Sequence, residues 1–204
     1  PTRLLMLPYE QWPLTPGNRR NTRADGTIIT YADGTVTAEP TPVRFLDFPE
    51  DLDHYNQDEL FLLTSGNVLS LADGDLFTTL YGRFGTDTEN HHYDCVAVCS
   101  DDGGFTWHYR SHVATWRSMP GSPEGPNESN TVRLADGRLM CVYRVGWNRQ
   151  QHYHRSFSAD EGHTWTQPAR FDDQWSVLPQ VLLLDGGALV LTGGRPGLMM
   201  WVDE

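Results

Sequence analysis

Apolar and polar positions along the chain repeat as short apolar runs that meet at an Asp-Gly pair. The run at residues 68–71 precedes Asp73-Gly74 and a second apolar run, and the same order returns around Asp136-Gly137 and Asp185-Gly186. Two apolar runs joined by Asp-Gly are a strong short-range signal of a β-hairpin. The chain is therefore predicted to contain three strand-turn-strand units, whose turns lie 63 and 49 residues apart.

A second repeat alternates with these hairpins. Residues 100–107 (SDDGGFTW) return as residues 158–165 (SADEGHTW), so the octet S-x-D-x-G-x-T-W occurs twice, 58 residues apart. In such a turn the Asp accepts hydrogen bonds from backbone N–H groups, Gly supplies a positive φ, and the Trp begins a strand and covers the hairpin. Internal repeats at this period predict a propeller or an array of similar units.

Composition favours an all-β fold for this chain. It has 204 residues with 19 Gly and 13 Pro, and few runs of helix-forming residues. One blade would take about 50 to 60 residues, enough for four strands and their loops, so three to four blades are expected. We expect the propeller blades in residues 59–204, and an N-terminal segment in residues 1–58 that is either separate or a partial blade.

Charge and cysteine content narrow the class of partner. A formal net charge of −12 argues against nucleic acid or an anionic membrane as a partner, because both attract a basic surface. No apolar stretch approaches the length of a membrane span, and no signal peptide is visible at the N-terminus. The three cysteines show no metal-binding spacing and are expected to be buried and unpaired, so no metal or other cofactor is predicted.

The octet resembles the Asp-box, or bacterial neuraminidase repeat, of the sialidase superfamily. The resemblance implies a six-bladed β-propeller of sialidase type, in which the box lies on the outer hairpin of a blade, far from the chemistry. About three to four blades would lie in this chain, and the third full blade, which begins near residue 177, would be truncated. The resemblance also implies a secreted or periplasmic location and an acidic sugar or glycan as the partner.

Site residues follow from the same resemblance. Glu128 precedes an apolar strand and Arg144 ends the partner strand, and in these positions they resemble the glutamate and the second triad arginine of sialidases. Arg195 follows the next hairpin and resembles the third triad arginine. In that family the arginines bind the substrate carboxylate, the glutamate draws a proton from a nucleophilic Tyr, and an Asp on a loop is the general acid. Asp87 occupies the corresponding loop, with Asp94 as the fallback.

The chain departs from the sialidase pattern in two respects. No arginine stands in the segment 63–68, where the family carries its first triad arginine, although Arg83 is a conceivable substitute. The nucleophilic Tyr would lie beyond Glu204. Enzymatic activity is thus an open question at the level of sequence, and each of these charged residues has an ordinary alternative as a solvated or ion-paired surface group.

Three functions remain open on the sequence. The first is a sialidase-like glycoside hydrolase that releases a terminal sialic acid or a related acidic sugar. The second is a non-catalytic Asp-box propeller that binds glycan or protein, and the third is a related propeller that hydrolyses or eliminates another polysaccharide. Four residues are candidates either for a sugar-stacking platform or for ordinary packing: Trp147, Tyr153, His154 and Trp175.

Overall fold

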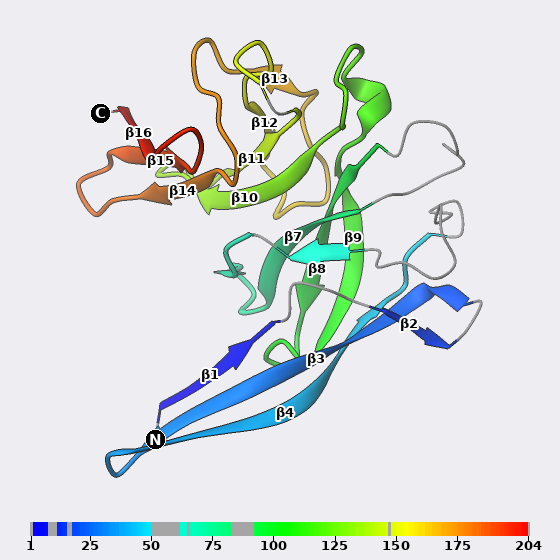
Figure 1. The fold of residues 1–204 in the computed structure, drawn as a ribbon. Helices are drawn as coiled ribbons and strands as arrows, with labels where there is room; N and C mark the ends of the chain where they lie inside the picture. The colour runs from blue at the N-terminus through cyan, green and yellow to red at the C-terminus, as the bar shows by residue number, and fades with distance from the viewer. Residues whose placement is uncertain are drawn as a thin grey trace.

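The computed structural model describes residues 2–7, 12–15, 18–49, 62–64, 66–82, 92–146 and 148–203. Strands dominate these residues, and the one helical element among them is a short 3-10 turn, η1 (Trp116–Ser118). No helix in these ranges is long and apolar enough to cross a membrane. The strands form three sheets that follow one another along the chain (Figure 1).

Each of the three sheets contributes one blade of a propeller. Blade I is part of a nine-stranded sheet, and in it two short strands, β5 and β6, both pair with β7. Blade II has four strands and blade III has three. The strands of blade I are β5 (Leu62–Thr64), β6 (Leu69–Ser70), β7 (Leu76–Gly82), β8 (Asp94–Ser100) and β9 (Thr106–Ala114). Those of blade II are β10 (Asn127–Arg133), β11 (Leu139–Arg144), β12 (His154–Ser158) and β13 (Ala169–Arg170), and those of blade III are β14 (Gln180–Leu183), β15 (Leu189–Gly193) and β16 (Met199–Asp203).

An N-terminal arm extends the sheet of blade I. A long antiparallel hairpin projects from the body of the molecule, with two shorter strands beside it (Figure 1). The hairpin joins blade I through three residues of its second strand, Arg44–Leu46, which pair in parallel with Thr106–His108. The strands of the arm are β1 (Thr2–Met6), β2 (Trp12–Thr15), β3 (Asn18–Ala32) and β4 (Thr35–Leu46).

The predicted Asp-Gly turns connect β6 to β7 in blade I, β10 to β11 in blade II and β14 to β15 in blade III. In blade II the N–H of Leu134 donates to the carbonyl of Arg138, and the N–H of Gly137 donates to the carbonyl of Leu134. The same two bonds recur around Leu71 and around Leu184. These three leucines therefore mark equivalent positions, so that a residue in one blade can be matched to its counterparts in the next.

The two octets form the turn that follows β8 in blade I and the turn that follows β12 in blade II. In the second octet the Ser158 hydroxyl donates to Asp160 Oδ1 at 2.8 Å and accepts the N–H of Gly162 at 2.9 Å. Asp160 also accepts the N–H of Thr164 at 2.9 Å, and the Trp165 indole donates to the Gly162 carbonyl at 3.2 Å. The first octet repeats these contacts, which explains why its fixed positions recur.

Three hydrophobic clusters hold the sheets together. The first lies between the N-terminal arm and blade I, where Phe45 packs against Trp107. The second joins blades I and II and includes Phe77, Cys95 and Cys141. The third joins blades II and III around Tyr153. The three cysteines are buried and free, as predicted, and burial raises the pKa of Cys99 to about 12.

Carboxamides connect the first strands of all three blades. Asn67, Asn130 and Gln180 each lie four residues before one of the equivalent turn leucines. Asn67 Nδ2 donates to Asn130 Oδ1 at 3.0 Å, and Asn130 Nδ2 donates to Gln180 Oε1 at 2.9 Å. The first strands therefore converge along one line, as the inner strands of a propeller do.

Candidate functional site

Glu128 and Arg144 lie at the same end of blade II. Asn127, the first residue of β10, pairs with Arg144, the last residue of β11, and the register is irregular between Asn127 and Asn130. Within this irregularity Glu128 takes the left-handed conformation, with φ 47°. Such a conformation costs about 1 to 2 kcal/mol for a residue with a Cβ, so it requires compensating contacts.

Those contacts come from a nearly buried cluster of charged groups. The Nε of Arg144 lies 2.9 Å from Glu128 Oε2 and also donates to Asn127 Oδ1 at 2.8 Å. Its Nη2 lies 3.2 Å from Glu124 Oε2. The side chains of Arg144 and Glu128 are only 12% and 13% exposed, so water screens their attraction weakly. Two carboxylates share one guanidinium, which gives the cluster a net charge of one negative unit.

Glu128 also reaches into blade III. Its Oε2 accepts the backbone N–H of Leu178 at 2.8 Å. Leu178 is the counterpart of Glu128 in the next blade, and it has the same left-handed conformation, with φ 48°. The Glu128 carboxylate therefore connects blade II to the beginning of blade III, at the joint between the two blades.

Arg195 approaches the same joint from the end of β15. The N–H of Gly194 donates to the carbonyl of Val177, which directly precedes Leu178. The backbone of Arg195 is fixed by Ser176, whose hydroxyl accepts the Arg195 N–H at 2.9 Å and donates to the Arg195 carbonyl at 2.5 Å. The Arg195 side chain is exposed and makes no ion pair with the described part of the chain.

Three predicted residues, Asp87, Arg83 and Trp147, lie outside the described residues. Asp94, the fallback for the general acid, is buried at the start of β8, and its Oδ1 accepts the N–H of Trp116 at 2.7 Å. This bond anchors η1 to blade I. The described residues contain no group of three or more His, Cys, Asp or Glu side chains arranged to hold a metal ion.

Two further residues of the centre carry no motif in the sequence, and for a third nearby residue, Tyr153, the sequence allows two interpretations. Glu124 lies in the polar loop before β10 and Asn127 is the first residue of that strand, and their only sequence signal is their closeness to Glu128. Tyr153 is fully buried rather than part of a sugar platform, and its hydroxyl donates to the Val177 carbonyl at 3.2 Å. Burial raises the pKa of Tyr153, so its hydroxyl stays protonated at neutral pH.

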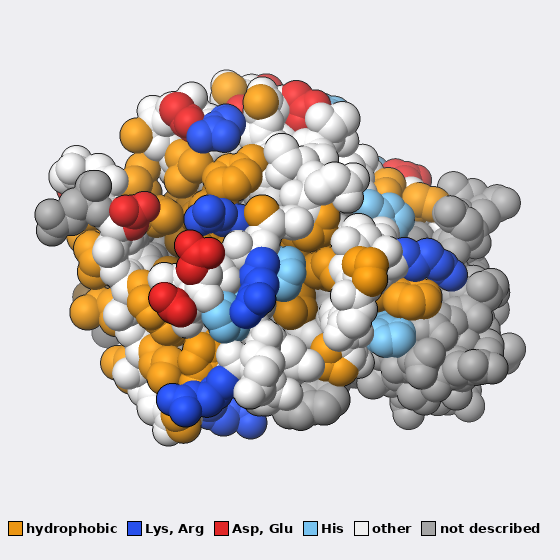
Figure 2. All heavy atoms as spheres, turned by 90° about the horizontal axis from the view of Figure 1, so that it is seen from above, with side chains coloured by type: hydrophobic (Ala, Val, Ile, Leu, Met, Phe, Trp, Pro, Cys, Tyr) orange, Lys and Arg blue, Asp and Glu red, His pale blue; other side chains and the backbone are white. Residues whose placement is uncertain are grey.

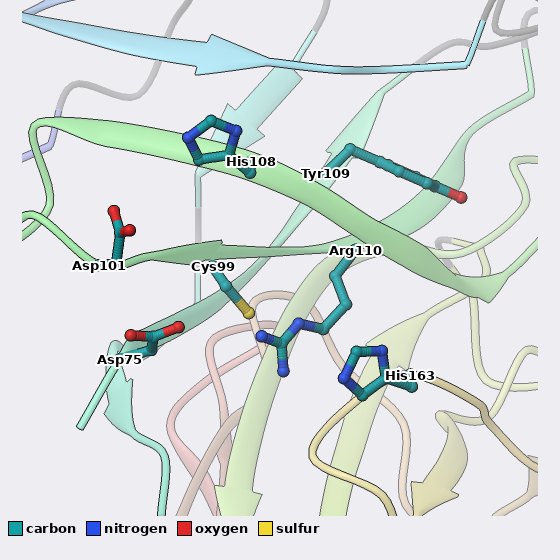
Figure 3. Close-up of a pocket in the computed structure, with 7 residues that line it drawn as sticks. All are labelled: Asp75, Cys99, Asp101, His108, Tyr109, Arg110 and His163. Atoms are coloured by element: carbon teal, nitrogen blue, oxygen red, sulfur yellow. The ribbon is translucent and has the colours of Figure 1, made fainter. Parts of the chain in front are cut away.

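A cavity of about 280 Å³ lies at the other end of the blades, near the octet turns (Figure 3). Asp75, Asp101, His108 and His163 are on its wall, and Arg110 lies beside His163 in the view. Arg110 Nη1 donates to the Glu161 carbonyl at 2.8 Å, so the guanidinium is already engaged between blades I and II. This cavity combines acidic and basic groups and is separate from the Glu128–Arg144 cluster.

The described part of the surface seen from above carries no field of a single sign. Acidic, basic and histidine side chains alternate there with apolar ones (Figure 2). On this face a negatively charged ligand would therefore be held by individual guanidinium groups rather than by a broad basic surface.

Comparison with known families gives one match that covers most of the chain. The model of the BNR repeat-like domain matches residues 26–197. No curated protein matches the chain significantly.

Solved structures share the fold at low sequence identity. A protein of unknown function from Dyadobacter fermentans DSM 18053 has a TM-score of 0.67 at 17% identity, over 98% of this chain and 57% of that one. The Hadza microbial sialidase Hz136 has a TM-score of 0.57 at 16% identity, over 88% of this chain and 34% of its own. A mutant of NanB sialidase from Streptococcus pneumoniae has a TM-score of 0.54 at 17% identity, over 89% of this chain and 26% of its own.

These superpositions confirm the predicted fold class, an all-β propeller of sialidase type. The chain spans 57% of the Dyadobacter protein and about a third or less of each sialidase.

Proposed function

Because the chain belongs to the family of BNR repeat-like domains, we propose that it is a glycan-processing propeller with its active centre at Glu128 and Arg144. The proposed reaction is hydrolysis of a glycosidic bond that releases a terminal sialic acid or a related acidic sugar. The two sialidases that share the fold support this choice of substrate class.

One observation carries the proposal, namely the ion pair of Glu128 with Arg144 at the joint of two blades. Hydrolysis of a glycoside passes through an oxocarbenium-like transition state, which a nearby negative charge stabilises. Glu128 supplies a fixed carboxylate for this purpose, because Arg144 holds it from blade II and the Leu178 N–H holds it from blade III. In the proposed reaction Glu128 either stabilises the positive charge of the transition state or accepts a proton from the nucleophilic Tyr that the family resemblance implies.

Arg195 is proposed to bind the carboxylate of the sugar. A guanidinium offers two parallel N–H donors that match a carboxylate, and Arg195 has no ion pair with the described part of the chain. Arg144 contributes less, because Glu124 and Glu128 already neutralise it. Asp87 as general acid and Arg83 as a further substrate-binding arginine remain part of the proposal.

The charge of the cluster supports a second candidate, a propeller that binds or cleaves a neutral glycan. With Glu124 and Glu128 on one guanidinium, the cluster carries net negative charge, which disfavours an anionic sugar directly beside it. A neutral sugar would meet no such repulsion. The two candidates therefore differ in whether a carboxylate on the sugar improves or weakens binding.

Release of a fluorescent aglycone from an aryl sialoside tests the first candidate. We expect Glu128→Gln to lower kcat by about a hundredfold or more, as the loss of a positioned acid-base group does. Glu161→Gln is the matched control, because Glu161 forms a similar ion pair with Arg133 near the octet turns. The sialidase proposal would be refuted if no aglycone is released, or if Glu128→Gln leaves its release unchanged. A panel of neutral and uronic-acid glycosides then tests the second candidate.

A further inference from the structure

The cavity of Figure 3 is lined by charged side chains that make no hydrogen bond in the octet turns. Asp101 and His163 occupy variable positions, the second of the first octet and the sixth of the second octet. The turns are held by fixed positions, among them Asp102 and Asp160, whose carboxylates accept backbone N–H groups. Asp75 joins the wall from the turn before β7, where only its backbone forms hydrogen bonds.

Arg110 brings a positive charge to the same cavity. Its Nη1 donates to the Glu161 carbonyl at 2.8 Å, whereas the Glu161 carboxylate is paired with Arg133. Neither Nε nor Nη2 of Arg110 forms a hydrogen bond or an ion pair with the described residues. Because a guanidinium has five N–H groups, these two nitrogens keep donors for a ligand.

Opposite charges therefore face the cavity without pairing. In the view of Figure 3 the carboxylates of Asp75 and Asp101 lie on one side, and the His163 ring lies on the other. The guanidinium of Arg110 lies between them. None of these four side chains forms an ion pair with the described part of the chain. A ligand in this space can bind both signs of charge, since carboxylates and a guanidinium both form charge-assisted hydrogen bonds.

The remaining groups on the wall add no free charge. The thiol of Cys99 stays protonated at neutral pH, because burial raises its pKa to about 12. The His108 ring is paired with Asp47 through Nδ1, and the Tyr109 hydroxyl lies 2.9 Å from His112 Nδ1. The charged groups left for a ligand are thus two carboxylates and one guanidinium, beside an imidazole.

These groups disfavour several kinds of ligand. The two carboxylates repel an anion, and the guanidinium repels a ligand that carries positive charge alone. The described residues contain no group of three or more metal-ligating side chains arranged to hold a metal ion. At about 280 Å³ the cavity is slightly smaller than the usual ligand pocket of about 300 Å³ or more, so an oligosaccharide is too large.

We propose that this cavity binds a small zwitterion, of which a free amino acid is the simplest example. The ammonium group lies against Asp75 and Asp101. The carboxylate accepts hydrogen bonds from Arg110 and from the His163 ring. Such a ligand supplies the counter-charge that each side of the cavity lacks. The site does not depend on the proposed hydrolysis, because it lies at the other end of the blades.

NMR titration of the unaltered protein with L-alanine tests the site. We expect L-alanine to shift the backbone signals of Asp101, Arg110 and His163. N-acetyl-L-alanine lacks the ammonium charge and L-alaninamide lacks the carboxylate, so each should bind about tenfold more weakly through the loss of one charge-assisted contact. Absence of shifts at these residues, or binding of either derivative as tight as that of L-alanine, would overturn the proposal.

Matched substitutions test the side of the cavity that binds the ammonium group. Asp75→Asn and Asp101→Asn should each weaken the binding of L-alanine about fivefold, because the two carboxylates share one ammonium group. Neither change should weaken the binding of N-acetyl-L-alanine, which has no such group. Asp185→Asn, in the exposed β14–β15 turn, is the control and should leave the affinity unchanged. Affinities for L-alanine that are equal in all three variants would contradict the assigned site.

Discussion

The carboxylate of Glu128 accepts the backbone N–H of Leu178 at 2.8 Å, and the two residues occupy equivalent left-handed positions in successive blades. A side chain of blade II thus holds the beginning of blade III. Because Arg144 binds the same carboxylate oxygen, the proposed centre and the joint between the blades depend on one charge cluster.

Removal of the arginine from this cluster should be costly. Arg144→Ala leaves the carboxylates of Glu124 and Glu128 nearly buried without a counter-charge, and we expect the free energy of unfolding to fall by about 3 to 5 kcal/mol. Urea unfolding at pH 7 measures this change. Arg133→Ala breaks the more exposed ion pair with Glu161 and should lower the free energy of unfolding by about 1 kcal/mol or less. Equal losses of stability in the two variants would contradict the burial of the Glu128–Arg144 cluster.

The octet turn of blade II should make stability depend on acid pH. The side-chain and backbone hydrogen bonds from Thr164 lower the pKa of Asp160 from 3.8 to about 2. Asp160 binds a proton less readily in the folded state than in the unfolded state. The stabilisation of the fold by the ionised Asp160 carboxylate is therefore complete above about pH 4 and disappears as the pH falls towards 2.

We therefore expect Asp160→Asn to lower Tm by about 2 °C at pH 6 and to leave it close to wild type at pH 2. Calorimetry across this range measures the difference, with Asp33→Asn in the exposed β3–β4 turn as the control. A difference in Tm between Asp160→Asn and wild type that persists unchanged at pH 2 would count against the hydrogen-bonding role of the carboxylate.

Two glycines with the same backbone conformation should respond differently to alanine. Gly137 has φ +89° with open space where an added Cβ would lie, whereas at Gly162, with φ +83°, a Cβ would lie 2.6 Å from the ring of Phe77. Gly137→Ala should cost about 1 to 2 kcal/mol from backbone strain alone. Gly162→Ala should lower the free energy of unfolding by about 1 to 3 kcal/mol more than Gly137→Ala, because Phe77 is fully buried and the blades must separate to make room for the methyl group. Similar free energies of unfolding for the two variants would show that the blades pack more loosely at Gly162.

The carboxamides between the first strands give a further prediction. Asn130 Oδ1 accepts from Asn67 and from the Val181 N–H at 3.3 Å, and Asn130 is fully buried. Asn130→Ala leaves these donors unsatisfied and should reduce the free energy of unfolding by about 1 to 3 kcal/mol. Asn148→Ala, in the β11–β12 loop, serves as the control in the same urea titration, and an equally mild effect of both changes would argue against convergence of the three strands.

The placement of Glu128 and Arg144 at one end of blade II could be predicted because it depends on local sequence. Glu128 and Arg144 stand equally far from Asp136, so a hairpin that turns there brings both to one end. The octets were equally informative, since their fixed Ser, Asp, Gly and Trp make the contacts that form the turn.

Contacts between distant segments left no comparable signal. The parallel pairing of Arg44–Leu46 with Thr106–His108 joins segments about sixty residues apart, and nothing local specifies it. The left-handed conformation of Glu128 and its bond to Leu178 likewise depend on how two blades pack. Glu124 went unrecognised for the same reason, because its role follows from the position of Arg144 rather than from a motif.

Isothermal titration calorimetry with N-acetylneuraminic acid and its methyl ester tests most directly whether the proposed site at Glu128 and Arg195 binds an acidic sugar. We predict that the free acid binds about tenfold more tightly than the ester, and that Arg195→Ala removes this preference, since only the acid forms a charge-assisted pair with the guanidinium. Equal affinities of acid and ester in the unaltered protein would contradict an acidic-sugar site.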